Sequence, residues 1–243
     1  ESTPIATIPS SSLYYKVCAF LITRYFGTNM PLTLLFFDQE PVRDSPFEYV
    51  VLPAATDASK SQAVGEGAHT AIAGKQHSFT IVPKDAYNNF RGWPHHSLSK
   101  DERHLDVFHA TAAMLDFDEG AAFFNVHVTY DASSRTFLAA YMPRKSGHYH
   151  LNITYEANDN SMHIYGSPFT LNVLPGATFA QESIAFGPGL HHGIAGDAVT
   201  ATILAFDANG NKRGVGSDAW EVTVKSLLAN NDYEYGTTLD HGN

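Results

Sequence analysis

Short stretches in which apolar and polar residues alternate recur along the chain and predict β-strands with one buried face. Residues 126–130 alternate in this way, residues 131–135 have the composition of a turn, and residues 136–142 return. A further stretch places Tyr149, Leu151, Ile153 and Tyr155 at every second position. About seven such stretches are separated by turn residues, and none has convincing helical periodicity. The pattern predicts an all-β, antiparallel sandwich.

The clearest feature of the sequence is an internal repeat, which is typical of proteins built from stacked units. Several segments occur twice at an offset of 122 residues without a gap: 45–47 at 167–169, 52–53 at 174–175, 63–74 at 185–196, and 85–89 at 207–211. Because separate segments share one offset, chance agreement is not a reasonable explanation.

The repeated residues suit turns and strands. Gly65 and Gly67, and their counterparts 122 residues later, suit a strand-breaking turn with positive φ angles. Residues 85–89 are rich in Asp and Asn, whose side chains can bond their own backbone in a turn. Alternation also predicts a strand with one core face at Phe79 and Ile81, and again at Val199, Ala201 and Ile203.

The order of these segments resembles the filamin repeat. That family's pattern runs from Ala-Gly through an Asp-Ala-x-x-Asn turn and a Gly-x-Tyr strand to a closing Gly-Ser-Pro-Phe strand. Here these motifs stand at 73–74, 85–89, 147–149 and 166–169. The resemblance implies tandem immunoglobulin-like (filamin-type) antiparallel β-sandwiches.

The repeat predicts one complete and two partial units. Residues 57–175 form the complete repeat, with an insertion near 95–122, because the unit exceeds the roughly 100 residues usual for such a sandwich. Residues 1–56 match the C-terminal half of a repeat, although Asp44 stands where Gly166 stands, and residues 176–243 match an N-terminal half. A half-sandwich cannot close its own core, so further sequence or a neighbouring chain is expected to complete each end.

Composition narrows the classes of partner. Among 243 residues, 15 are basic and 25 acidic, and no cluster of Lys and Arg forms a surface for nucleic acid. Cys18 is the single cysteine, which excludes an intrachain disulfide and favours a reducing compartment. The N-terminal stretch has no secretory pattern, and no apolar run is long enough to span a bilayer, so we expect no direct membrane insertion.

Candidate chemistry is sparse. His148 and His150 project from one strand face and could form a metal site with His127 or His163, but outward strand positions accept any polar residue. Cys18 alternates with apolar neighbours, which is typical of a buried thiol. No nucleophile elbow or phosphate-binding loop occurs. We therefore expect no enzyme, no cofactor and no metal.

The resemblance implies that partner peptides bind in a groove between the third and fourth strands. In this sequence the groove would lie between the strand near 105–114 and the strand at 124–130. Its candidate partner-binding residues are Phe108, Ala110, Ala112, Met114, Phe124, Val126, Val128 and Tyr130. The alternative is that all of these residues belong to the core, because one face of each strand must be buried. Asn152 begins an Asn-Ile-Thr sequon on an outward position and is a possible glycosylation site.

Three functions remain open. The first is a cytoplasmic scaffold or crosslinker, cytoskeletal or ciliary, whose partners are other proteins that add a strand to an exposed edge. The second is an extracellular adhesion protein, because filamin-like repeats also occur in gamete adhesion proteins and the sequon faces outward. The third is a filament subunit whose partial ends pair with further copies of itself.

Overall fold

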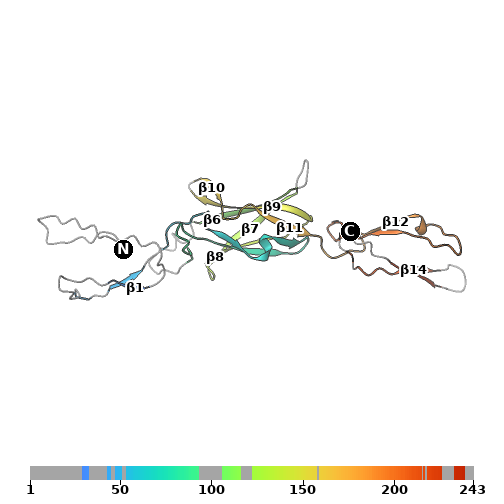
Figure 1. The fold of residues 1–243 in the computed structure, drawn as a ribbon, viewed down its shortest axis with the longest axis horizontal. Helices are drawn as coiled ribbons and strands as arrows, with labels where there is room; N and C mark the ends of the chain where they lie inside the picture. The colour runs from blue at the N-terminus through green and yellow to red at the C-terminus, as the bar shows by residue number, and fades with distance from the viewer. Residues whose placement is uncertain are drawn as a thin grey trace.

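A computed structural model describes residues 29–32, 43–44, 47–50, 53–92, 106–115, 122–157, 159–214, 216, 218–225 and 233–238. A β-sandwich occupies the middle of the chain, with shorter strand pairs at either end (Figure 1). Within these residues, no helix has the length and hydropathy that a membrane crossing requires.

Nine strands build the central sandwich, and their bounds confirm the predicted all-β class. They are β3 (Gln62–Val64), β4 (Thr70–Ile72), β5 (His77–Val82), β6 (Val107–Met114), β7 (Phe123–Asp131), β8 (Thr136–Tyr141), β9 (Gly147–Ala157), β10 (Asn160–His163) and β11 (Phe169–Leu174). One layer has the order β3-β5-β8-β7, and the other has the order β6-β9-β11-β4 with β10 added beside β9. All pairs are antiparallel except β11 with β4.

The core lies between the two layers and follows the alternation seen in the sequence. On β9 the four predicted residues are buried, with exposed fractions of 0–8% for Tyr149, Leu151, Ile153 and Tyr155. The facing layer contributes Phe79, Ile81 and Phe137, which are also buried. Since alternate side chains on a strand point to opposite faces, each strand seals the core with one set and faces solvent with the other.

Strand β7 belongs to both layers. Its first half, Phe123 to Val126, pairs with β6, and its second half, His127 to Asp131, pairs with β8. The predicted hairpin of β7 and β8 is present, and its turn includes Arg135 at a φ angle of 58°. The crossover of β7 between layers joins eight of the strands in one continuous hydrogen-bonded path, and β10 pairs with β9 beside it.

The segments outside the sandwich contain short antiparallel pairs. These are β1 (Asn29–Leu32) with β2 (Phe47–Val50), β12 (Ile184–Phe186) with β13 (Thr202–Leu204), and β14 (Val222–Lys225) with β15 (Tyr233–Gly236).

The segment after β11 repeats the elements that open the sandwich. β12 lies 122 residues after β3, and the single turn η3 (Pro188–Leu190) lies 122 residues after η1 (Glu66–Ala68). The glycine before each turn has a positive φ angle, 121° at Gly65 and 123° at Gly187. Isolated bridges also recur, from Thr56 to Asp85 and from Thr178 to Asp207.

One predicted strand is shorter and more exposed than its counterpart. Val199 and Ala201 precede β13 rather than forming part of it, and Val199 is 53% exposed. The corresponding face of β5 is buried because β6 and β9 cover it in the central sandwich. In the described part of 176–243, no second layer covers β13.

Strand β6 lies within the expected insertion near 95–122. Residues 107–114 are a core strand, with Ala112 fully buried, so any surplus is confined to the segments on either side of β6. Those flanking segments, like Cys18, lie outside the described residues.

Candidate functional site

The candidate binding strands β6 and β7 place half of their predicted residues in the core. Phe108, Ala110, Ala112 and Val126 are at most 6% exposed, so they are not an accessible surface. The other four are partly buried and pack against the core: Met114, Phe124, Val128 and Tyr130. Any contact with a partner at these strands therefore involves the backbone edge or this second group.

Hydrogen bonds show which backbone groups of β6 face which neighbour. The Met114 N–H donates to the Ala122 carbonyl on the β7 side (3.1 Å), and the Leu115 N–H donates to the His148 carbonyl on the β9 side (2.8 Å). The N–H and C=O groups of successive residues point to alternate sides of a strand. Phe108 lies an even number of residues from Met114, so its N–H and C=O point to the β7 side as well. Pairing with β7 stops at Ala110, so in the described part of the chain the backbone of Phe108 has no β7 partner. We call this backbone the open edge, although side chains cover it and Phe108 is only 5% exposed.

One aromatic ring, that of Phe137, contacts both the open edge and the second half of β7. The Phe137 ring on β8 lies 4.8 Å from the Phe108 ring and 5.3 Å from the Tyr130 ring, measured between centroids. An apolar side chain of a partner that entered beside Phe108 would therefore contact Val128 and Tyr130, next to aromatic rings that already pack against one another.

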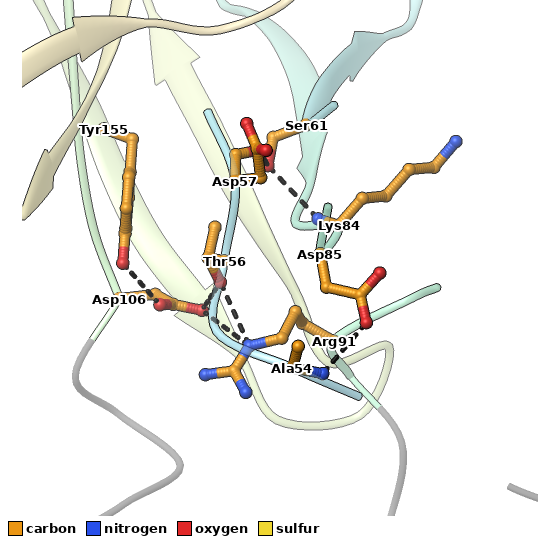
Figure 2. A network of polar contacts seen from close by, with 9 residues as sticks. All are labelled: Ala54, Thr56, Asp57, Ser61, Lys84, Asp85, Arg91, Asp106 and Tyr155. Atoms are coloured by element: carbon orange, nitrogen blue, oxygen red, sulfur yellow. Dashed lines mark hydrogen bonds and ion pairs between the residues drawn. The ribbon is translucent and has the colours of Figure 1, made fainter. Parts of the chain in front are cut away.

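A polar network holds the start of β6 in place (Figure 2). Thr56 Oγ1 donates to Asp106 Oδ2 (2.6 Å), Arg91 Nε donates to Thr56 Oγ1 (3.0 Å), and the Tyr155 hydroxyl donates to Asp106 Oδ1 (3.1 Å). Burial, and then the negative charge of Asp106, raise the pKa of Tyr155. Because Asp106 directly precedes β6, these bonds tie the open edge to β9.

Part of this network occurs again after β11, and the sequence could indicate it only in part. Thr178 Oγ1 donates to Asp218 Oδ2, and Arg213 Nε lies 3.3 Å from that oxygen. Thr and Arg recur at the 122-residue offset, so this part was detectable. The Asp does not recur at this offset, because Asp106 follows Arg91 by fifteen positions whereas Asp218 follows Arg213 by only five.

Asp85 anchors the predicted turn from within the fold, and Figure 2 shows its bond to Ala54. It is 0% exposed, and its carboxylate accepts four bonds: from the N–H groups of Ala54 (2.9 Å), Tyr87 (2.9 Å) and Asn89 (2.8 Å), and from Asn89 Nδ2 (2.9 Å). Burial alone raises the pKa of Asp85, but these bonds outweigh it and hold the pKa below 3.8. Asp207 has the equivalent environment, and its pKa is lowered in the same way.

The outer face of β9 is polar. His148 and His150 are exposed there as predicted, and His109 Nε2 lies 2.7 Å from Glu156 Oε2 in an exposed pair. His127 belongs to the half of β7 that pairs with β8 instead. Among the described residues, no three His, Cys, Asp or Glu side chains come together as a metal site.

Asn152 lies in the middle of β9. It is opposite Thr111 of β6, and its side chain is partly exposed. The residues on either side of it, Leu151 and Ile153, face the core and are fully buried. Asn152 therefore faces outward, the orientation that a glycan requires.

Buried polar residues in the described part all serve turns. They are Ser61, Asp85, Asn89, Asp207 and Asn211. Ser61 Oγ, for example, donates to the Asp57 carbonyl (2.9 Å) and accepts from the Lys84 N–H (3.1 Å), as Figure 2 shows. These contacts satisfy the hydrogen-bonding groups of the buried polar side chains and give the side chains a structural role.

Comparison with known proteins identifies one family. The model for the filamin/ABP280 repeat matches residues 55–170. The solved Lin-41 filamin domain is 22% identical, over 49% of this chain and 97% of that chain, with a TM-score of 0.33. The Escherichia coli adhesin FdeC is 18% identical over 78% of this chain and 53% of that chain (TM-score 0.43), and domains 5–6 of the S-layer protein SbsC are 16% identical over 74% and 83% (TM-score 0.30).

Proposed function

Because residues 55–170 of this chain are a filamin/ABP280 repeat, we propose that the chain is a non-enzymatic structural and interaction module. It is part of an array of such repeats that scaffolds or crosslinks partner proteins. Partners bind by adding an extended segment to an exposed strand edge and by contacts with the sheet surfaces.

The end of β6–β7 pairing at Ala110 is the observation that carries this proposal, and a partner that adds a strand beyond it must displace the side chains that leave Phe108 only 5% exposed. The N–H and C=O of Phe108 point away from β9, beyond the last β6–β7 pair at Ala110. An unpaired edge is a template for another strand, and Val128 and Tyr130 supply apolar contacts beside it. Specificity then comes from alternate side chains of the partner segment.

The partial units at the two ends also belong to this proposal. We assign residues 176–243 to the N-terminal half of a further repeat, since β12, η3 and the Thr178 and Asp207 contacts reproduce those of 54–92 at one offset. Residues 1–56 are assigned to a C-terminal half on the sequence repeat alone. The proposed function is that of one complete unit within such an array.

Peptide selection tests the strand-addition mechanism. A random dodecapeptide display library is selected against the whole chain, and the selected peptides are titrated into isotope-labelled protein. We expect peptides with alternating apolar residues that shift the amide resonances of Val107, Phe108 and His109. Val128→Arg should abolish their binding, because a charged side chain would occupy the apolar contact beside the edge.

The matched control is Leu138→Arg on the neighbouring strand. Leu138 is 42% exposed, so this variant adds the same charge to the same layer without entering the edge. A second variant, Val128→Thr, keeps the shape of the side chain and weakens the same apolar contact if Val128→Arg does not fold. Peptides that bind all three variants equally would show that strand addition at β6 is wrong.

Location has two candidates within this proposal, of which the cytoskeletal or ciliary scaffold is the first. The second is an extracellular adhesion protein, and the outward position of Asn152 on β9 favours it. Mass analysis of the protein from its natural source separates them. An N-glycosidase-sensitive glycan at Asn152 would exclude the cytoplasmic scaffold, whereas unmodified Asn152 together with a cytoskeletal fraction would exclude the adhesion protein.

A further inference from the structure

The junction after β11 leaves little free chain between the sandwich and the segment that follows. The Leu174 carbonyl accepts a bond from the Ala73 N–H (2.8 Å), and two residues later the Gly176 N–H donates to Asp207 Oδ2 (2.7 Å). The Gly176 carbonyl also accepts from Arg213 Nη1 (2.6 Å). Both ends of the connection are therefore anchored, one to each repeat.

Asn211 bridges the junction with its side chain. Nδ2 donates to the Arg144 carbonyl (2.8 Å) and to Asp207 Oδ2 (2.8 Å), and Oδ1 accepts from the Ser146 N–H (3.0 Å). The residue is 5% exposed. One amide therefore joins its own turn to the loop that precedes β9 in the sandwich.

A side chain of the following turn also lies close to Gly74. Gly74 has a φ angle of 77°, and a Cβ atom placed there would lie 2.7 Å from Asn209 Nδ2 in the following turn. Gly196, its counterpart 122 residues later, has a φ angle of 90° but nothing within 4 Å. The two positions share the same backbone preference, and only Gly74 is crowded by the next segment.

The rest of the junction is open. A cleft of about 420 Å³ lies beside it, lined by Arg144, Lys145, Glu182 and residues 208–210. No broad apolar interface is needed to explain the arrangement, so a few named contacts decide the orientation across the junction.

We propose that Gly74 and the backbone of residues 144–146 form a docking surface for the Asp-x-x-x-Asn turn of the next repeat. Docking holds successive repeats in one orientation, so this junction is rigid. The turn thereby has two roles. Asp207 closes the turn and bonds the linker at Gly176, and Asn211 bonds the backbone of the preceding repeat.

The same arrangement is expected at the preceding junction. Ala54, which follows Leu52-Pro53 as Gly176 follows Leu174-Pro175, donates its N–H to Asp85 Oδ2 (2.9 Å). Asn89 bonds Asp85 as Asn211 bonds Asp207. The closure of the turn and its hold on the linker therefore occur at both junctions. This inference goes beyond the proposed function, because it requires no partner protein.

Distance distributions between two spin labels test it in the whole chain. The labels are placed at Ala132→Cys and Gln181→Cys, two exposed positions on opposite sides of the junction, with the single native cysteine removed by Cys18→Ser. We expect a single narrow distribution. Asn211→Ala should replace it with a broad one, and Gly74→Ala should broaden it less, because the added Cβ meets only the end of the Asn209 side chain.

Each variant has a control at its counterpart. Gly196→Ala introduces the same backbone strain without the contact, and Asn89→Ala removes the same turn bond to Asp without touching this junction. Both should retain the narrow distribution. A broad distribution in the unaltered chain, or a narrow one in both Gly74→Ala and Asn211→Ala, would overturn the proposal.

Folding and the proposed function are followed separately. Amide resonances of Leu151 and Ile153 report whether the sandwich stays folded, and if Gly74→Ala loses them, Asn211→Ala decides. Peptide binding at the β6 edge should be unchanged in both variants. Loss of rigidity with retained peptide binding would therefore be distinguishable from failure of the strand-addition mechanism.

Discussion

Replacing Asp85 by alanine should destabilise the central sandwich strongly. The carboxylate is 0% exposed and accepts four hydrogen bonds, two of them from Asn89, which is 9% exposed. A bond to a charged group contributes about 1.5–3 kcal/mol, so the two buried bonds from Asn89 alone amount to about 3–6 kcal/mol. The bonds from Ala54 and Tyr87 are left out of this figure, because water can reach those partly exposed donors.

Urea unfolding followed by circular dichroism measures this loss. Asp85→Ala should lower the free energy of unfolding by at least about 3 kcal/mol, a large part of the roughly 5–15 kcal/mol typical of a domain. Ser59→Ala is the control in the same region, since Ser59 is exposed and its hydroxyl bonds only Asp57, and it should change stability by less than about 0.5 kcal/mol. A loss of less than about 1 kcal/mol in Asp85→Ala would refute the assignment of this turn as a main stabilising element.

The lowered pKa of Asp85 predicts how the stability of the sandwich depends on acidic pH. The hydrogen bonds of the carboxylate hold the pKa of Asp85 below 3.8, so near and below that pH the unfolded chain binds more protons than the native one. The stabilisation is fully present above the unfolded pKa and is lost as the pH falls through the lower, native pKa. Asp85→Asn cannot titrate, so its stability should fall less steeply in this acidic range, and an unchanged slope would contradict the assignment.

Two further predictions concern the core. Leu151→Ala should cost about 2–5 kcal/mol in urea unfolding, because the side chain is fully buried and leaves a cavity, whereas Leu138→Ala at a 42% exposed position should change stability little. Equal losses in the two variants would show that β9 is not central to the core. Burial raises the pKa of Tyr141 to about 12, and its hydroxyl donates to the Gly67 carbonyl. The native state therefore keeps this proton between pH 10 and about 12 while the unfolded chain releases it, so stability falls as the pH rises through that window. Tyr141→Phe should remove this part of the alkaline slope, and phenolate absorbance of the folded protein checks the titration directly.

The β6 and β7 candidates show where sequence patterns stop being informative. Alternation separates the two faces of each strand correctly, but it does not say that β7 leaves β6 after Val126 to pair with β8. That exchange creates the open edge at Phe108. It depends on where two layers diverge in space, and no spacing along the chain records such a position.

The sequence by itself determined the repeat and its local consequences. Gly65 and Gly187 adopt the positive φ angles that only glycine accepts easily, and Asp85 and Asp207 close equivalent turns. The buried face of β9 was likewise readable from alternation. These features depend on neighbouring residues, whose backbone preferences and side-chain periodicity are local properties of the chain.

Only the tertiary structure decided which distant groups meet. It joined Thr56, Arg91 and Asp106, although the Asp lies outside the 122-residue pattern, and it brought Asn211 to the backbone of Arg144 and Ser146. It also showed that Gly74 is crowded where Gly196 is not. Such contacts depend on the packing of whole layers and repeats, and a hydrogen bond between residues far apart in sequence leaves no periodic trace along the chain.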